Sequence, residues 1–231
     1  MQPAYIPWLG YFDRVAASDL HIVLDHVSMD INSKTKFTNR NKVRTKDGWT
    51  WLTVPLKSKG KYGQLFIDQL EVVEDKWNIK HWKSIENCYR KAPYFEEHGP
   101  ALQDIFLNRP VRLVDFITLI NDYLFSSLNI PTKRANSSEM NVAGDQSDLI
   151  LNLCVAAGAT KYISGPFGRD YLDQGSFDAK GIEILYHDYD HPQYSQVYEG
   201  FEPYMSVLDL LFNHGPESSA IITSQRPVSN Q

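Results

Sequence analysis

Two histidines and two aspartates lie close together in the run from Tyr186 to Pro192. A histidine held by a carboxylate can act as a general base, so His187 with Asp188 as its orienting acid is one candidate pair. His191 is the preferred catalytic base, because the Pro-x-Tyr-x-Gln sequence that follows indicates a shaped turn. His187, Asp188 and His191 also offer nitrogen and oxygen ligands for a divalent metal, but no regular spacing fixes them and no metal is assigned. The remaining alternative is a polar loop whose histidines bond to the backbone.

A second candidate site is a glycine-containing turn that follows a predicted strand. Gly165 and Gly168 carry no side chains, so the backbone can approach a ligand closely there. Arg169 can form a forked pair with a phosphate or a carboxylate. Asp170 can bind a sugar hydroxyl or cap the next helix, and Tyr171 completes this candidate binding set. No Lys-Ser or Lys-Thr pair follows the glycines, which excludes a Walker loop, and a purely structural turn is the alternative.

The first block of the chain, Gln2 to Phe12, contains two prolines and a glycine and cannot be one regular element. With a strand before it and a helix and strand after it, the block would form a β-loop-α-β unit whose helix N-terminus can hold phosphate. Tyr5, Trp8 and Tyr11 are its candidate ligand-lining residues. The unit is similar, more weakly, to that of nucleotidyltransferases and pantothenate synthetases, but it lacks both histidines of their His-x-Gly-His motif. A rigid aromatic turn that seals the core is the alternative.

Six basic residues gather between Lys34 and Lys46, in a chain whose net charge is −5. Their even spacing places several of them on one face of a strand, where they can hold the pyrophosphate of a nucleotide sugar. Arg40, flanked by Asn39 and Asn41, is suited to binding a polyanion or a sugar. A solvated face is the alternative. Nucleic acid is not an expected partner, because a mildly acidic protein gains nothing from bulk attraction to polyanions.

The elements that must position these residues alternate between strands and helices, which favours an α/β fold with a largely parallel, Rossmann-like sheet flanked by helices. The predicted strands are 20–24, 49–56, 66–73, 161–164 and 182–186, and the region 49–73 can add an antiparallel hairpin. The predicted helices are 11–17, 77–89, 113–124, 147–158 and 206–215, the last opened by a capping box. Residues 129–145 are predicted to form a polar connection. We expect one domain over residues 1–218 and a frayed tail over 219–231.

Composition and cysteine usage indicate a cytoplasmic protein. Cys88 and Cys154 lie far apart in predicted helices and form no Cys-x-x-Cys pair, which indicates a reducing compartment. The sequence shows no signal-peptide core and no apolar run of about 18 residues, the length that a membrane span requires. The expected partner is a small molecule, and a homo-oligomer is left open.

Several blocks of this sequence resemble the WbqC-like protein family, in the expected order and over nearly the whole chain. They lie at residues 2–12, 39–41, 51–55, 89–95, 164–172, 191–196 and 208–216. The resemblance implies an association with bacterial surface polysaccharide, including the O-antigen of lipopolysaccharide, and a role in attaching glycine to an amino sugar. It implies no particular catalytic residue. Members carry a short apolar strand before the Gln-Pro block, whereas this sequence starts at Met1, so that first strand is expected to be trimmed or missing.

The resemblance and the clusters together favour a transferase that adds glycine or a similar acyl group to an amino sugar, carried on a nucleotide. His191 would deprotonate the sugar ammonium, while Arg169 and Arg40 would stabilise developing negative charge. A free carboxylate does not acylate an amine unaided, so ATP or an activated acyl donor is the expected co-substrate. One alternative is a nucleotidyltransferase-like enzyme that uses ATP or CTP, suggested by the opening unit. The other is a non-catalytic sugar-binding module, suggested by the aromatic content.

Overall fold

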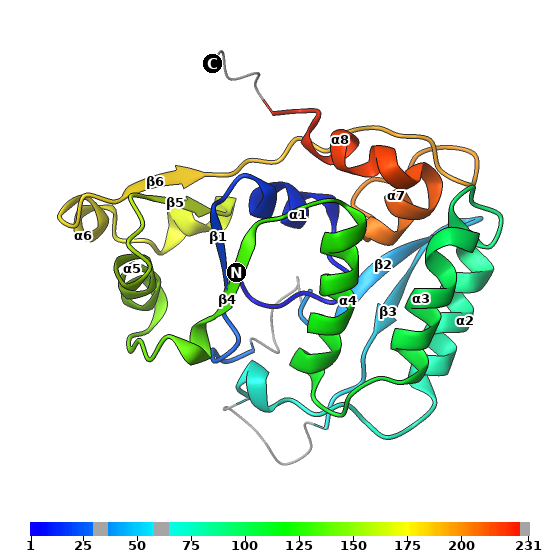
Figure 1. Ribbon diagram of the computed structural model, residues 1–231, viewed down its shortest axis with the longest axis horizontal. Helices are drawn as coiled ribbons and strands as arrows, with labels where there is room; N and C mark the ends of the chain where they lie inside the picture. Colours follow the sequence, from blue (N-terminus) through cyan, green and yellow to red (C-terminus); the bar gives the residue numbers. More distant parts are fainter. Residues whose placement is uncertain (30–36, 58–64, 227–231) are drawn as a thin grey trace.

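The computed structural model describes residues 1–29, 37–57 and 65–226, and its helices and strands alternate along the chain (Figure 1). The strands are β1 (Leu20–Val23), β2 (Arg40–Thr45), β3 (Gly48–Thr53), β4 (Lys133–Asn136), β5 (Lys161–Ser164) and β6 (Glu183–Tyr186). The α-helices are α1 (Leu9–Ala16), α2 (Trp77–Tyr89), α3 (Phe95–Leu107), α4 (Leu113–Ser127), α5 (Gln146–Ala156), α6 (Gln174–Asp178), α7 (Val207–His214) and α8 (Ser218–Thr223). Short 3-10 turns are η1 (Ile67–Gln69), η2 (Ser137–Glu139), η3 (Pro166–Asp170) and η4 (Gly215–Glu217).

The parallel strands form two separate pairs in the described part of the chain. β1 pairs with β4, and β5 pairs with β6, each in parallel register. β2 and β3 form an antiparallel hairpin in which Arg40 lies opposite Thr53 and Thr45 lies opposite Gly48. The predicted α/β class is confirmed, with parallel strands, flanking helices and an added hairpin. The parallel strands are divided between two small sheets, where one sheet was predicted.

The hairpin places Arg40 and Lys42 of β2 on its outer face, whereas Arg44, the third basic residue of the strand, is buried. Gly48 turns the chain with a φ of 128°, a conformation that favours glycine. Side chains alternate along β2, so Asn41 and Val43 are buried while Arg40 and Lys42 are partly exposed. This is the alternation expected from the even spacing of the basic cluster. Lys34 and Lys36 lie outside the described residues.

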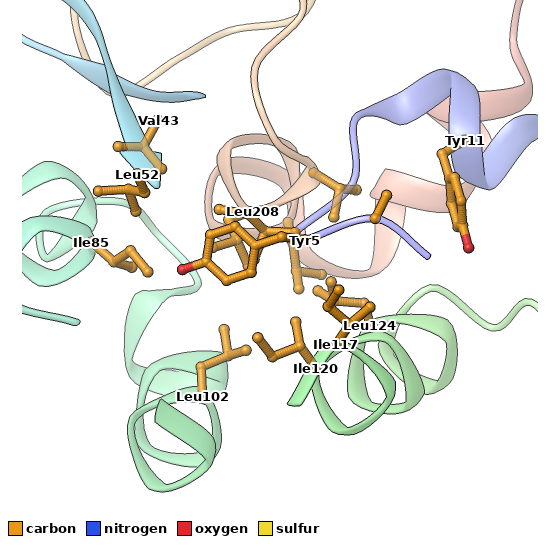
Figure 2. Close-up of a cluster of buried hydrophobic side chains, with 14 of the residues drawn as sticks. Tyr5, Tyr11, Val43, Leu52, Ile85, Leu102, Ile117, Ile120, Leu124 and Leu208 are labelled. Carbon is orange, nitrogen blue, oxygen red and sulfur yellow. The ribbon is translucent and has the colours of Figure 1, made fainter. Parts of the chain in front are cut away.

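Most apolar side chains pack into one large core between the hairpin, α1, α2, α3, α4 and α7. Figure 2 shows Tyr5 in the middle of this core, with Ile85 and Leu52 on one side and Ile117 and Leu124 on the other. A second, smaller core forms around α5, α6 and the β5–β6 pair, from Ile150, Leu151, Cys154, Phe177, Ile182 and Ile184. Each large apolar side chain that is fully buried contributes roughly 1.5–3 kcal/mol to folding, so the large core dominates stability.

Two predicted segments have a different structure. Residues 66–73 were predicted as a strand, but they contain η1 and isolated bridges. Ile67, Leu70 and Val72 are all buried, a spacing that a strand with alternating faces does not provide. The polar connection at 129–145 contains β4, whose pairing with β1 could not be read from its polar sequence.

The C-terminal region also differs from prediction. The chain after Ser218 was predicted to be frayed, but it forms α8, and Arg226 beyond it reaches α1. Residues 227–231 lie outside the described residues. The capping box does not form, because Ser206 makes no side-chain capping bond and Asp209 bonds to Tyr194. Helix α3 was not predicted, and it contains Pro100 in its second turn.

A cavity of about 410 Å³ separates the two parallel pairs. Its lining includes the facing strands β1 and β5, with α5 on one side and Arg14 of α1 on the other. At one end Met1 already pairs with β1: its carbonyl oxygen accepts from the N–H of Leu24 at 2.7 Å, and its ammonium donates to the carbonyl oxygen of Ile22 at 2.7 Å. Met1 is therefore in register to continue a parallel strand along β1.

An apolar extension of about six residues placed before Met1 is expected to stabilise the protein. Such a segment would run between β1 and β5, pair with both strands and bury side chains against α5. A gain of even one buried apolar side chain would raise Tm by about 3 °C or more in a domain of this size. Differential scanning calorimetry checks this against a Gly-Ser extension of equal length, and equal Tm values for the two extensions would contradict it.

Candidate active site

His187 follows directly after β6, at the carboxyl ends of the β5–β6 pair. Its backbone N–H donates to the carbonyl oxygen of Ser164, the last residue of β5, at 2.8 Å. Its imidazole Nε2 lies 2.6 Å from Oδ2 of Asp13, which projects from α1. Ligands of open parallel sheets bind beyond the carboxyl ends of the strands, so this pair stands where a site is expected. The carboxylate that orients His187 is Asp13, whereas the sequence suggested Asp188.

Asp13 is a buried carboxylate, 3% exposed, with a partner on each oxygen. Nε of Arg226 donates to Oδ1 at 2.7 Å, and the same guanidinium contacts the Asp13 carbonyl oxygen. These pairings offset the cost of burying the charge. With Asp13 accepting from Nε2, a neutral His187 carries its lone pair on Nδ1, and that atom has no hydrogen bond to the described residues. The arrangement fits a general base with a fixed tautomer.

An aromatic wall, made of Trp8, Tyr189, His191 and Tyr204, lies beside His187. Tyr189 stacks on the His187 imidazole, with ring centroids 5.8 Å apart and an interplanar angle of 18°. Trp8 meets Tyr189 edge-on at 5.4 Å and lies 6.0 Å from Tyr204. Tyr204 is 51% exposed and has a φ of 60°, a conformation that costs energy outside glycine and is often retained at functional sites. A half-open aromatic surface of this kind can pack against a sugar ring.

His191 belongs to this wall, but both of its ring nitrogens are engaged by the backbone. Nδ1 lies 2.9 Å from the carbonyl oxygen of Pro192, and Nε2 accepts from the N–H of Tyr204 at 3.2 Å. Burial lowers the pKa of His191 from its usual value. A neutral ring with one donor and one acceptor satisfied has no lone pair left for a substrate. This geometry favours His187 over His191 as the base.

Arg169 and Asp188 form a two-pronged ion pair near the same strand ends. The guanidinium donates to both carboxylate oxygens, at 2.8 and 2.6 Å, and its carbon lies 4.4 Å from the Tyr186 ring centroid. The ion pair raises the pKa of Arg169 and lowers that of Asp188. Both side chains are exposed, so the pair contributes little to stability and can open when an anion competes for the guanidinium.

Gly165, which precedes η3, and Gly168, which lies within it, are both closely packed. A Cβ atom at Gly165 would collide with the Arg14 guanidinium, and one at Gly168 would collide with the Ser164 hydroxyl. The structure therefore explains both glycines without a ligand. Asp170 is exposed at the end of η3, and Tyr171 after it is 46% exposed, with a pKa that partial burial raises.

Three further residues predicted to bind substrate are buried in the large core or the hairpin. The hydroxyl of Tyr5 lies 2.8 Å from Nδ1 of His81, and that of Tyr11 lies 3.1 Å from Nε2 of His21. Asn39 is buried, and its Nδ2 donates to the carbonyl oxygen of Val54 at 3.0 Å. These side chains hold the fold together and do not reach the His187 site.

The opening block, Gln2 to Phe12, therefore mainly seals the core. This is the alternative to ligand binding that the sequence also allows. Residues 3–7 are buried, so the loop is not placed to present its amides to a phosphate. Trp8, which is partly exposed, is the member of this block that reaches the site. Arg40 lies on the hairpin, away from the β5–β6 pair (Figure 1), with its guanidinium 4.4 Å from the Trp51 ring centroid.

Asp13, Tyr189, Tyr204 and Arg226 were not predicted as site residues. Asp13 could have been recognised from the sequence, because it is an acidic residue within the otherwise apolar start of an amphipathic helix. Arg226 could not, because it lies in a tail predicted to be frayed. Among the described residues, no group of three or more His, Cys, Asp or Glu side chains is arranged to hold a metal ion. Likewise, none of the described helices is long and apolar enough to cross a membrane.

These features define an α/β protein with a histidine–carboxylate pair at the carboxyl ends of parallel strands. The chain belongs to the WbqC-like protein family, whose model matches residues 2–221. It is 38% identical over 221 residues to the uncharacterized protein Rv1507c of Mycobacterium tuberculosis, an alignment that covers 94% of each chain. No solved structure matches the chain.

Proposed function

We propose that the protein is a cytoplasmic transferase that attaches glycine or a similar acyl group to the amine of a nucleotide-linked amino sugar, in the biosynthesis of bacterial surface polysaccharide. The observation that carries the proposal is the His187–Asp13 pair, whose histidine Nδ1 makes no hydrogen bond to the described residues and lies beside the half-open aromatic wall. Family membership supports the polysaccharide context through the resemblance described above.

In this reaction the sugar ammonium first loses a proton to Nδ1 of His187. The free amine then attacks the carbonyl carbon of an acyl group activated as an acyl phosphate or an acyl adenylate. The C–N bond forms, the C–O bond to the phosphoryl group breaks, and the leaving phosphate or nucleotide takes the electron pair. The nitrogen of the new amide then loses its second proton to solvent. Asp13 stabilises the imidazolium that forms, which then releases its proton to solvent.

Two surfaces position the substrates for this step. Trp8 and Tyr204 offer ring faces for the sugar, and their partial exposure leaves them accessible. Arg169 can exchange Asp188 for the phosphoryl group of the donor, because a guanidinium binds phosphate and carboxylate with the same forked geometry. Holding the amine and the acyl carbon together supplies much of the rate enhancement in reactions of this class.

An amide-forming assay tests the proposal. Purified protein is incubated with ATP, glycine and UDP- or dTDP-linked amino sugars, and products are identified by mass spectrometry. The expected product is the amino sugar joined to one glycine through an amide, with the loss of one water. Pyrophosphate release with no acyl product would favour a nucleotidyltransferase. Saccharide binding without turnover in any donor mixture would favour a binding module, and either outcome would contradict the proposal.

A further inference from the structure

The outer face of the β2–β3 hairpin carries two cations and two indole rings, which we call the indole–cation face. Arg40 and Lys42 come from β2, and Trp49 and Trp51 come from β3. Register places Lys42 directly opposite Trp51. Because side chains two residues apart share one face of a strand, all four project from the same side of the hairpin.

Cations and rings alternate along this face. The Arg40 guanidinium carbon lies 4.4 Å from the Trp51 ring centroid, and the Lys42 ammonium lies 4.6 Å from that of Trp49. The two indoles meet edge to face, with centroids 5.8 Å apart. Trp49 is 44% exposed, so a large apolar ring is open to solvent beside a positive charge. With the Trp49 ring on one side of it, the Lys42 ammonium can still donate to an anion from its other side.

The positive charge of Lys42 is not balanced within the described residues. Lys42 takes part in none of the ion pairs found among the described residues. Partial burial lowers the pKa of Lys42, and Glu202, the acid that acts on it, only partly offsets this. A partly desolvated ammonium without a paired carboxylate is stabilised when an anion binds beside it. The chain as a whole has a net charge of −5, so the attraction for an anion is local to this face.

We propose that the indole–cation face binds an acidic saccharide, with a sugar ring packed on Trp49 and its carboxylate or phosphate paired with Lys42. The C–H bonds on one side of a pyranose make an apolar surface that matches an exposed indole. Nucleic acid fits less well, because it binds through many phosphate contacts and this face offers two cations on an acidic protein. The proposal does not depend on the reaction at His187.

Isothermal titration calorimetry with tetragalacturonate, a short acidic oligosaccharide, tests this inference on the full chain. Maltotetraose of equal length serves as the neutral comparison, and a dT oligonucleotide serves as the nucleic-acid comparison. We expect binding of tetragalacturonate that weakens with added salt and exceeds the binding of maltotetraose. Trp49→Ala and Lys42→Gln should each weaken it by at least about tenfold.

Lys133→Gln is the matched control, because this lysine is exposed on β4, away from the hairpin. Its affinity for tetragalacturonate should equal that of the wild type, and circular dichroism confirms that each variant is folded. Absence of binding, equal binding in all three variants, or equal binding of maltotetraose would overturn the inference. Tighter binding of the oligonucleotide would assign the face to nucleic acid instead. A His187→Gln variant that keeps this affinity separates the face from the proposed reaction.

Discussion

Replacing His187 with glutamine is expected to lower kcat for amide formation by about 10³-fold, within the 10²–10⁴ range typical of a positioned general base. The glutamine amide can still donate to Asp13, so the local structure is kept while the basic nitrogen is lost. Because the proposed sugar site is the aromatic wall and not His187, KM should change little. Initial rates at saturating donor, measured across a range of acceptor concentrations, separate the two parameters.

His214→Gln supplies a matched control, since His214 bonds to Ser195 and has no contact with Asp13 or the aromatic wall. Its rate should stay near that of the wild type. Asp13→Asn tests the positioning of the base: kcat should fall while the affinity for the sugar is kept. A wild-type kcat in the His187→Gln enzyme would show that His187 is not the base. Another polar group near the strand ends would then have to take that role.

Asp209→Asn is expected to remove a pH dependence of stability that the wild type shows between about pH 4 and pH 6. Asp209 is fully buried, and Tyr194 and Gln196 donate to its Oδ2 at 2.9 and 2.8 Å. Burial raises its pKa to about 6, although these hydrogen bonds and the nearby Arg44 act in the opposite direction. In the unfolded chain an aspartate titrates near pH 3.9.

Because the folded state holds this proton more tightly, its contribution to the free energy of unfolding is greatest below about pH 4 and is lost as pH rises to about 6. The full difference is on the order of 3 kcal/mol. Asparagine stays neutral and keeps an accepting oxygen for Tyr194, so the variant should gain stability relative to the wild type as pH rises through this window. Urea unfolding at pH 4.5 and pH 7.5 measures this change, with the exposed Asp19→Asn as control. Parallel pH profiles for wild type and Asp209→Asn would contradict the expectation.

Part of the site could be predicted from sequence because it depends on short local patterns. Strands 161–164 and 182–186 were found as short apolar runs bounded by glycines and polar residues, and they match β5 and β6 closely. That placement puts His187 at a strand end, where a ligand is expected. Trp8 is also predicted from its local sequence, because it is an aromatic residue in a segment that contains prolines and a glycine.

The partner of His187 could not be predicted, because Asp13 lies 174 positions away along the chain. No spacing rule connects a first-helix acid to a histidine after the last strand. Asp188 was chosen because it is adjacent in sequence, yet neighbouring residues on an extended segment point in opposite directions. It is this geometry that sends Asp188 toward Arg169 and His187 toward α1.

The division into two cores has a consequence for the local stability of the protein. In Figure 1 the β5–β6 pair, α5 and α6 lie on one side of the molecule, and the large core around α2, α3 and α7 lies on the other. Among the described residues, no strand pairing joins β1 to β5. Within that part of the chain, the smaller unit therefore has no sheet hydrogen bonds to the larger one and can unfold locally while the larger one stays intact. Asp13 and Trp8 belong to the larger unit, whereas Arg169 belongs to the smaller one. A substrate that contacts residues of both units would therefore hold the two units together. Its binding would make the whole chain more rigid.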